Sequence, residues 1–272
     1  MKPKTNPLEM NKLQEYTRSV IEETNASVIK EKLSWLLSFY DVINYKLCYE
    51  FGIWRAVKCD SPDGFENVKD LSFPPKESTK AGRLNEPKEP VFYAAFIIHT
   101  ALEEVGAKEG DYVHVSFYKI DNNTGLRGCV VGEILRVHRS GRAMLSDKLG
   151  ESLNRILTPM SKYEGMKYIF MDAFLASMLS NENASKNDYL HTRILGKLLM
   201  NSVKDIDAMV YPSITLEGAV NVAIKTKAVS STLTLNGNSV IKINKRYDHG
   251  IFDFSIVKHS NKKNSDGTIV WG

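Results

Sequence analysis

The sequence predicts an α+β fold. Helical periodicity fills residues 8–48 and roughly 142–203, whereas short apolar strands fill most of 52–138 and recur through 208–271. This order of helices, mixed strands, helices and strands, with no internal repeat, favours a sheet assembled from both ends of the chain.

Composition restricts the class of protein. The 272 residues carry a net charge of +4 and are 43% hydrophobic, which excludes disorder as the main state because there is ample apolar surface to bury. The longest apolar run, residues 91–98, is too short to cross a membrane, and the N-terminus lacks the apolar core of a secretory signal. Cys48, Cys59 and Cys129 are odd in number and lack metal-ligand spacing, so we expect no disulfide, no metal and a reducing, cytoplasmic location.

Residues 8–48 predict two helices separated by Asn25-Ala26-Ser27, with Ser27 as the N-cap of the second, whose apolar stripe runs on to Ile43. We interpret residues 1–50 as an electrically neutral helical extension. A scaffold is its simplest role, and docking of an inhibitor or formation of a dimer stay open.

The next part of the chain alternates strands and loops. Ile53–Val57 and Val91–Ala95 predict strands on either side of a long loop over residues 60–90, which is rich in Pro, Gly, Lys and Glu. A short helix is expected over Ile98–Val105. Two further strands, Tyr112–Ile120 and Gly128–His138, are joined by residues typical of a hairpin turn.

The second half predicts a helical block and then strands. The helices are expected at Leu149–Leu157, Met166–Leu179 and Tyr189–Val203. The strands are expected at Ala208–Tyr211, Val220–Lys225, Val240–Ile243, Phe252–Val257 and Ile269–Trp271. Between Asn221 and Lys263 eight Lys or Arg face two Asp, a local charge of +6, which fits either a solvated sheet face or a surface for a polyanion.

The sequence contains no dinucleotide-binding glycine motif, no Walker A loop, no HExxH and no GxSxG. Instead, polar residues flank the apolar strands in a fixed order. The pieces are IWRAV (53–57), GRLN (82–85), PVFYAA (90–95), TALEEV (100–105) and VYPS (210–213).

These pieces, in this order over about residues 50–230, resemble the RES domain family, best known as the toxin half of toxin–antitoxin pairs. Two positions depart from the family's pattern, because Leu84 stands where an aromatic residue is usual and Lys88 where a glycine is usual. The resemblance implies an ADP-ribosyltransferase-like split sheet over residues 51–272, with 106–203 partly a helical insertion. It also implies degradation of NAD as substrate and a cognate antitoxin or other inhibitor protein as partner.

The chemistry of NAD cleavage determines which side chains such a site requires. Nicotinamide leaves as a neutral molecule, so no general acid is required, while positive charge develops on the ribose. A carboxylate near the sugar would stabilise that charge. Glu104 and Glu103 compete for this role. The spacing of Ile97, Ala101 and Glu104 predicts that Glu104 faces inward and that Glu103 faces water.

The other predicted site residues supply cations, an aromatic wall and small polar groups. Arg55 and Arg83 are expected to bind the pyrophosphate, since a guanidinium binds phosphate bidentately. Tyr93 would stack on a ring of the dinucleotide, Ser213 would orient the ribose, and Asn85 is an auxiliary ligand. An ion pair between Glu104 and either arginine is the structural alternative.

Three functions therefore stay open at this point. The first is an NAD glycohydrolase or phosphorylase acting as a toxin or defence effector, with water or phosphate as acceptor. The second is an ADP-ribosyltransferase that modifies a protein or nucleic acid. The third is a non-catalytic module that binds nucleic acid or an acidic partner through the basic C-terminal face. The sequence leaves open whether the chain forms a homo-oligomer.

Overall fold

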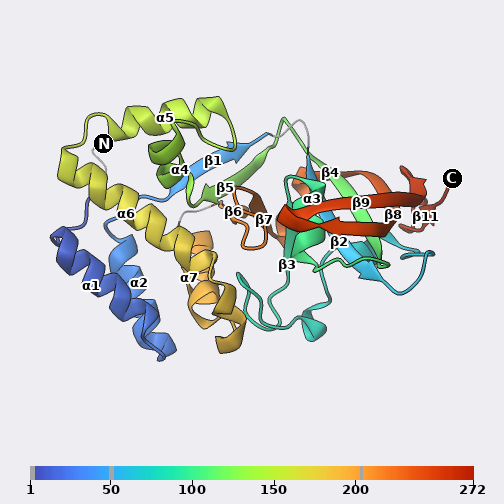
Figure 1. Ribbon diagram of the computed structural model, residues 1–272, viewed down its shortest axis with the longest axis horizontal. Coiled ribbons are helices and arrows are strands. Elements are labelled where there is room, and N and C mark those ends of the chain that lie inside the picture. The colour runs from blue at the N-terminus through green and yellow to red at the C-terminus, as the bar shows by residue number, and fades with distance from the viewer. Residues whose placement is uncertain (1–3, 49–51, 203–204) are drawn as a thin grey trace. The chain divides into compact units, whose positions relative to one another are not determined.

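The computed structural model describes residues 4–48, 52–202 and 205–272 (Figure 1). It combines helices with parallel and antiparallel strand pairs, as the α+β prediction requires. The chain folds as two compact units, each drawn from three stretches. Unit 1 comprises Met1–Tyr45, Ala81–Glu86 and Gly128–Tyr211, and unit 2 comprises Lys46–Lys80, Pro87–Arg127 and Pro212–Gly272. The predicted boundary at residue 50 lies outside the described residues.

Unit 1 is mainly helical. Its helices are α1 (Met10–Ile21), α2 (Ala26–Leu37), α4 (Glu133–Ser140), α5 (Asp147–Leu157), α6 (Lys162–Leu179), the short 3-10 helix η3 (Glu182–Asn187) and α7 (Leu190–Ser202). Strand β6 (Ala208–Pro212) pairs in parallel with β5 (Leu126–Val130). In Figure 1, α2 runs between α1 and α7, and the fully buried Ile29, Leu33 and Leu36 form its inner face.

The start of unit 1 confirms two predicted helices and corrects two details. The side chain of Asn25, not that of Ser27, caps α2, because its Oδ1 accepts hydrogen bonds from the main-chain N–H groups of Ser27 and Val28. The predicted continuation of this helix to Ile43 is wrong. Residues 43–47 form strand β1 (Ile43–Leu47), in which half-buried and exposed side chains alternate.

Unit 2 is an antiparallel sheet in the strand order β7-β3-β2-β4-β8-β9. Its strands are β2 (Ile53–Cys59), β3 (Val91–Ala95), β4 (Tyr112–Ile120), β7 (Val220–Lys225), β8 (Leu233–Tyr247) and β9 (Ile251–Ser260). Helices α3 (Ile98–Glu104) and α8 (Thr226–Thr232), the 3-10 turns η1 (Val68–Leu71), η2 (Lys76–Ser78) and η4 (Asp248–Gly250), and the pair β10 (Lys262–Lys263) and β11 (Ile269–Val270) complete it.

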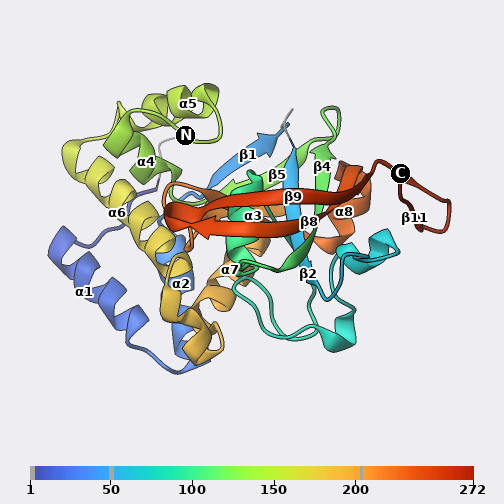
Figure 2. The same cartoon turned by 45° about the vertical axis from the view of Figure 1, so that its right-hand side comes forward.

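One face of this sheet carries the core of unit 2. Helix α3 buries Ala101 and Leu102 against Val113 and Val115 of β4 and Ile241 of β8. Both views show α3 beside the long β8–β9 ribbon (Figures 1 and 2). The C-terminal residue of α3, Glu104, is joined to β7 by a hydrogen bond from Asn221.

The segment after β4 differs from its prediction. Asp121 does form the expected turn, because its Oδ1 accepts from the N–H groups of Asn123 and Thr124. The strands on either side do not form a hairpin, since β4 pairs with β2 and β8 while β5 pairs with β6. The predicted strand 128–138 is also wrong beyond Val130. Gly132 adopts a left-handed backbone (φ 94°), which ends the strand, and α4 begins at Glu133.

Most other boundaries agree with the predictions to within a few residues. Val91–Ala95, Tyr112–Ile120 and Val220–Lys225 are strands with the predicted ends. Helix α8 was not anticipated, and β8 is far longer than the predicted Val240–Ile243. Val203, the predicted end of α7, lies outside the described residues. No helix in the described part of the chain is long and apolar enough to span a bilayer.

Candidate functional site

Helix α3 ends in two adjacent glutamates whose surroundings are opposite to the prediction. Glu103 is only 7% exposed and forms a bidentate ion pair with Arg246 of β8, at 2.8 and 3.1 Å. Glu104 is exposed. The periodicity argument failed because it took Ile97 as part of the apolar face, whereas Ile97 is the extended N-cap residue of α3 and is 48% exposed.

Three neutral side chains hold the carboxylate of Glu104. Its Oε1 accepts hydrogen bonds from Ser213 Oγ at 2.7 Å, Asn221 Nδ2 at 2.6 Å and Thr215 Oγ1 at 3.3 Å. Within the described residues, Oε2 accepts no hydrogen bond and no cation pairs with either oxygen. We call Glu104, Ser213, Thr215 and Asn221 the Glu104 cluster.

The loop between β6 and β7 positions the donors of the cluster. The N–H of Ser213 donates to the carbonyl of Ala219, and the N–H of Leu216 donates to Ser213 Oγ at 3.3 Å. Gly218 takes the left-handed backbone (φ 78°) that lets the loop turn back into β7. Ser213 Oγ therefore donates to Glu104 and accepts from Leu216, and it also lies 3.1 Å from Thr215 Oγ1, so the two hydroxyl groups are hydrogen-bonded to each other as well as to the carboxylate.

The sequence prediction included Ser213 and Glu104 but missed Thr215 and Asn221. Asn221 is 3% exposed and stands in β7 beside Val222, Ala223 and Ile224, which are fully buried. An amide inside an otherwise apolar strand is the signal that would have found it, because a buried amide needs a partner.

Tyr93 lies on the same face of the sheet as the Glu104 cluster. In the antiparallel register, Tyr93 pairs with Ala223 and Ala95 pairs with Asn221, and residues two apart in a strand share a face. Tyr93 and Asn221 are therefore separated by about two residues along neighbouring strands, roughly 7 Å. The half-buried Tyr93 ring is thus close enough to border a ligand held at Glu104.

Arg55 does not join the cluster. Trp54 pairs with Ala95 on the face of the Glu104 cluster, so Arg55 starts from the opposite face. Its Nε and Nη1 each donate at 2.7 Å to main-chain carbonyls, those of Leu71 and Tyr93, and its guanidinium stacks on the ring of Phe92. The expected convergence of Arg55 with Glu104 is therefore corrected.

The charge of Arg55 has no acidic partner in the described chain. Burial lowers the pKa of its guanidinium to about 10, so the group stays positively charged at neutral pH. It lies where β2 and β3 diverge, since Trp54 with Ala95 is the one pair of their register. The guanidinium of Arg55 thus donates to the Tyr93 carbonyl, which would have accepted a main-chain hydrogen bond from β2 if the pairing of β2 with β3 had continued.

Arg83 and Asn85 belong to unit 1. Arg83 donates to the carbonyls of Leu179 and Asn181 at the end of α6, at 2.7 and 3.2 Å, and lies over the ring of Tyr189. Asn85 is buried and closes a tight turn through two main-chain hydrogen bonds with Gly82. A guanidinium that caps helix carbonyls has a structural role already, and a role of either residue at Glu104 stays a prediction.

The two departures from the family pattern have local explanations. Leu84 is buried against Gly196 of α7, where an added Cβ would approach Leu84 to 2.8 Å, so this contact leaves little room for a larger side chain. Lys88 has φ 63°, in the left-handed region that favours glycine. The backbone at position 88 thus has the conformation that a glycine would adopt without strain, and Lys88 adopts it with some strain.

The basic C-terminal stretch lies largely on the β8–β9 ribbon, where several of its cations are already engaged. Arg246 pairs with Glu103, while Lys242, Lys245 and Lys258 lie over the rings of Tyr112, Tyr247 and Trp271. Among the described residues, no three His, Cys, Asp or Glu side chains gather as metal ligands would.

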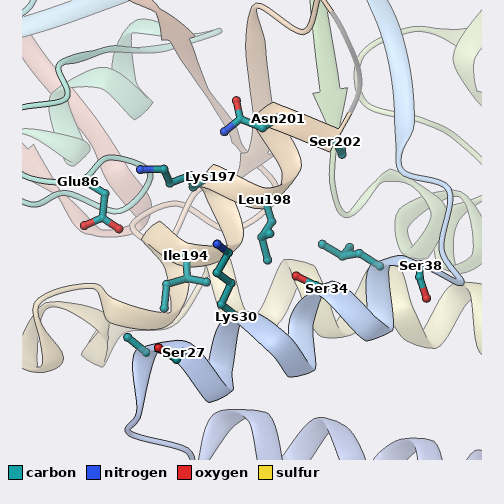
Figure 3. Close-up of a pocket in the computed structure, with 12 residues that line it drawn as sticks. Ser27, Lys30, Ser34, Ser38, Glu86, Ile194, Lys197, Leu198, Asn201 and Ser202 are labelled. Atoms are coloured by element: carbon teal, nitrogen blue, oxygen red, sulfur yellow. The ribbon is translucent and has the colours of Figure 1, made fainter.

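Unit 1 contains a separate pocket of about 730 Å³ between α2 and α7 (Figure 3). Lys30 and Ser34 of α2 and Ile194, Lys197 and Leu198 of α7 line it, together with Glu86 and further small polar residues. None of the six predicted site residues lines this pocket, so it does not belong to the predicted NAD chemistry.

Comparison with known proteins bears on the family. A search of curated proteins finds no match. The model of the RES domain family matches residues 53–235, about two thirds of the chain, and this range includes the whole Glu104 cluster. The chain therefore belongs to the RES domain family.

Proposed function

We propose that this chain cleaves the bond between nicotinamide and ribose in NAD, with Glu104 as the residue that stabilises the developing ribosyl cation. The observation that supports this most is the state of the Glu104 carboxylate. One oxygen is held by three neutral donors, and the other is left without a partner on an exposed side chain. A carboxylate held without a cation keeps its negative charge available to a substrate.

The proposed cleavage requires few catalytic groups from the protein. The C1′–N bond breaks and its electron pair moves to the nicotinamide nitrogen, which loses its positive charge, so the leaving group needs no proton. The ribose carbon then bonds to the oxygen of water or phosphate, and the acceptor's proton is lost to solvent. Oε2 of Glu104 lies beside the sugar while the cationic character is greatest, and the Tyr93 ring borders the nicotinamide.

Ser213 and Arg83 support this reaction in different ways. Ser213 acts on Glu104, since its Oγ donates to Oε1, rather than on the ribose directly. Arg83 stays the proposed pyrophosphate ligand and Asn85 its auxiliary. Arg55 braces the gap between β2 and β3 instead. That gap, beside a five-residue β3–β7 ladder, favours the split sheet of an ADP-ribosyltransferase-like fold.

The test compares two neighbouring glutamates. Incubation of the purified chain with NAD should release nicotinamide. Glu104→Gln keeps an oxygen for the three donors but removes the charge, so we expect turnover to fall about 10²- to 10³-fold with an unchanged melting temperature. Glu103→Gln breaks the pair with Arg246, so it should lower the melting temperature slightly and leave turnover within a few-fold of the parent. Equal turnover of parent and Glu104→Gln would refute the proposal.

Chromatography of the products identifies the acceptor. Free ADP-ribose indicates water, a phosphorylated product that depends on added phosphate indicates phosphorolysis, and label from NAD attached to a macromolecule indicates transfer. An enzyme that depletes NAD inside a cell is toxic unless an inhibitor restrains it. We therefore expect expression of the parent chain, but not of Glu104→Gln, to arrest growth, and a cognate inhibitor protein to reverse the arrest.

A further inference from the structure

The buried side chain of Asn221 forms one hydrogen bond in the described structure, and that bond is to Glu104. Asn221 is 3% exposed, and its Nδ2 donates to Glu104 Oε1 at 2.6 Å, the shortest of the three bonds to that oxygen. Its other side-chain atom, Oδ1, is buried without any hydrogen-bond partner in the described chain. All of its side-chain bonding is therefore directed at Glu104.

Chemistry fixes the orientation of this amide. A carboxylate only accepts hydrogen bonds, so the nitrogen of Asn221 must face Glu104 and the carbonyl oxygen must face away. A buried carbonyl oxygen without a donor costs free energy that a leucine of similar shape would avoid. The one side-chain hydrogen bond of Asn221 within the described chain is therefore the bond to Glu104.

The sheet makes Asn221 the most firmly placed donor in the Glu104 cluster. Asn221 is inside β7 and pairs with Ala95 of β3, whereas Ser213 and Thr215 belong to the loop before β7. We propose that Asn221 is a positioning residue, which holds Oε1 so that Oε2 is presented to the sugar of the substrate. This inference rests on the proposed function and extends it to a residue that does not itself touch the substrate.

Two substitutions test the proposal through kcat and KM for NAD. Asn221→Leu removes the donor and the orphaned acceptor together, so kcat should fall about 10- to 100-fold, KM should change less than about twofold, and the melting temperature should stay the same or rise. Asn221→Asp places a second carboxylate against Glu104. It should be slower than the leucine variant at pH 7.5 and should recover relative to the parent as the pH is lowered to about 5.5, because a protonated aspartic acid can donate.

Asn238 provides the matched control. It is also 3% exposed within a strand of unit 2, but its Oδ1 accepts from Ser116 Oγ at 2.8 Å. Asn238→Leu should lower the melting temperature and leave kcat unchanged.

The outcomes separate the two proposals. If Glu104→Gln is inactive while Asn221→Leu keeps the parent kcat, or if the aspartate variant shows no recovery at lower pH, Asn221 does not position Glu104 and the proposed function stands. If the parent chain fails to consume NAD, the proposed function is refuted and the role of Asn221 falls with it.

Discussion

Asp172 in unit 1 and Glu104 in unit 2 each accept three hydrogen bonds, but they use their oxygens differently. Asp172 is fully buried in α6. Its Oδ1 accepts from the hydroxyl of Tyr40 and the N–H of Gly132, and its Oδ2 accepts from the N–H of Leu135. Both oxygens are occupied, and the bonds fasten the end of the α2 segment and the start of α4 to α6.

Glu104 has the same number of bonds and the opposite arrangement. All three donors are side chains, all meet Oε1, and the residue is exposed. Glu103 gives a third pattern, since its two oxygens are taken by Arg246. The number of hydrogen bonds therefore does not distinguish the carboxylate that we propose acts on NAD from the structural one. The useful distinction is whether one oxygen is left accessible while the other is held.

Removal of Asp172 should produce the largest change in stability. Asp172→Ala leaves two buried N–H groups and the Tyr40 hydroxyl without an acceptor, so we expect the free energy of unfolding to fall by about 3 to 5 kcal/mol. Tyr40→Phe removes one of the three bonds and should cost about 1 kcal/mol. Urea denaturation measures both. If Asp172→Ala lowers the free energy of unfolding by less than Tyr40→Phe does, the three hydrogen bonds to Asp172 do not stabilise unit 1 as described.

The two units should respond to acid in opposite directions. His114 of unit 2 is fully buried, its Nδ1 accepts from the N–H of Phe65, and burial lowers its pKa to about 4 from an ordinary 6.5. A lowered pKa means that the unfolded chain binds the proton more tightly. The stability due to neutral His114 is therefore complete above about pH 6.5 and is lost as the pH falls to about 4, a change of about 3 kcal/mol.

Burial has the reverse effect on the carboxyl groups of unit 1. It raises the pKa of Asp172 and of Glu133, so the folded unit binds those protons more tightly, and their contribution to stability is lost as the pH rises. Hydrogen exchange measured from pH 7 to 4, and corrected for the intrinsic rates, should show unit 2 losing protection first. His114→Asn, which keeps an acceptor for Phe65 but does not titrate, should abolish that difference. Protection lost first in unit 1 would contradict the assignment.

Substitutions of Ser213 and Thr215 test how much each hydrogen bond to Glu104 contributes to turnover. Ser213→Ala removes a 2.7 Å bond from the Glu104 cluster, whereas Thr215→Ala removes one of 3.3 Å. We expect kcat for NAD to fall about tenfold in the first and about twofold in the second, because shorter bonds to a charged acceptor are stronger. Equal losses would show that the loop acts as a unit rather than through separate bonds.

Local patterns predicted much of the sheet. Val91–Ala95, Tyr112–Ile120 and Val220–Lys225 are strands with the predicted ends, since each is an apolar run bounded by polar or turn residues. The pattern misled at 128–138, where Ile134 and Val137 also fit a helix, and the glycine that ends β5 decides between the two.

The site was less accessible to sequence reasoning. Helix α3 has seven residues, so its periodicity depends on which residue is counted first, and Ile97 was the wrong choice. Asn221 meets Glu104 across 117 residues of sequence, through the register of β3 with β7. Strand register depends on tertiary packing, and no local spacing expresses it.

The smallest expected effect concerns the backbone that leads into β3, the strand that carries Tyr93. Lys88 has φ 63°, and its N–H donates to the carbonyl of Thr79 at 3.0 Å, so the bond holds a non-glycine residue in a conformation that costs about 1 kcal/mol. Lys88→Gly relieves that strain and adds freedom to the unfolded chain, so the net gain in stability should be about 0.5 kcal/mol. The same change at Lys76, in the 3-10 turn η2, relieves nothing and should destabilise by a similar amount. Urea denaturation measures both changes in the free energy of unfolding. A gain for Lys88→Gly with a loss for Lys76→Gly would locate the strain at Lys88, and changes of the same sign would show that the left-handed backbone there is not strained.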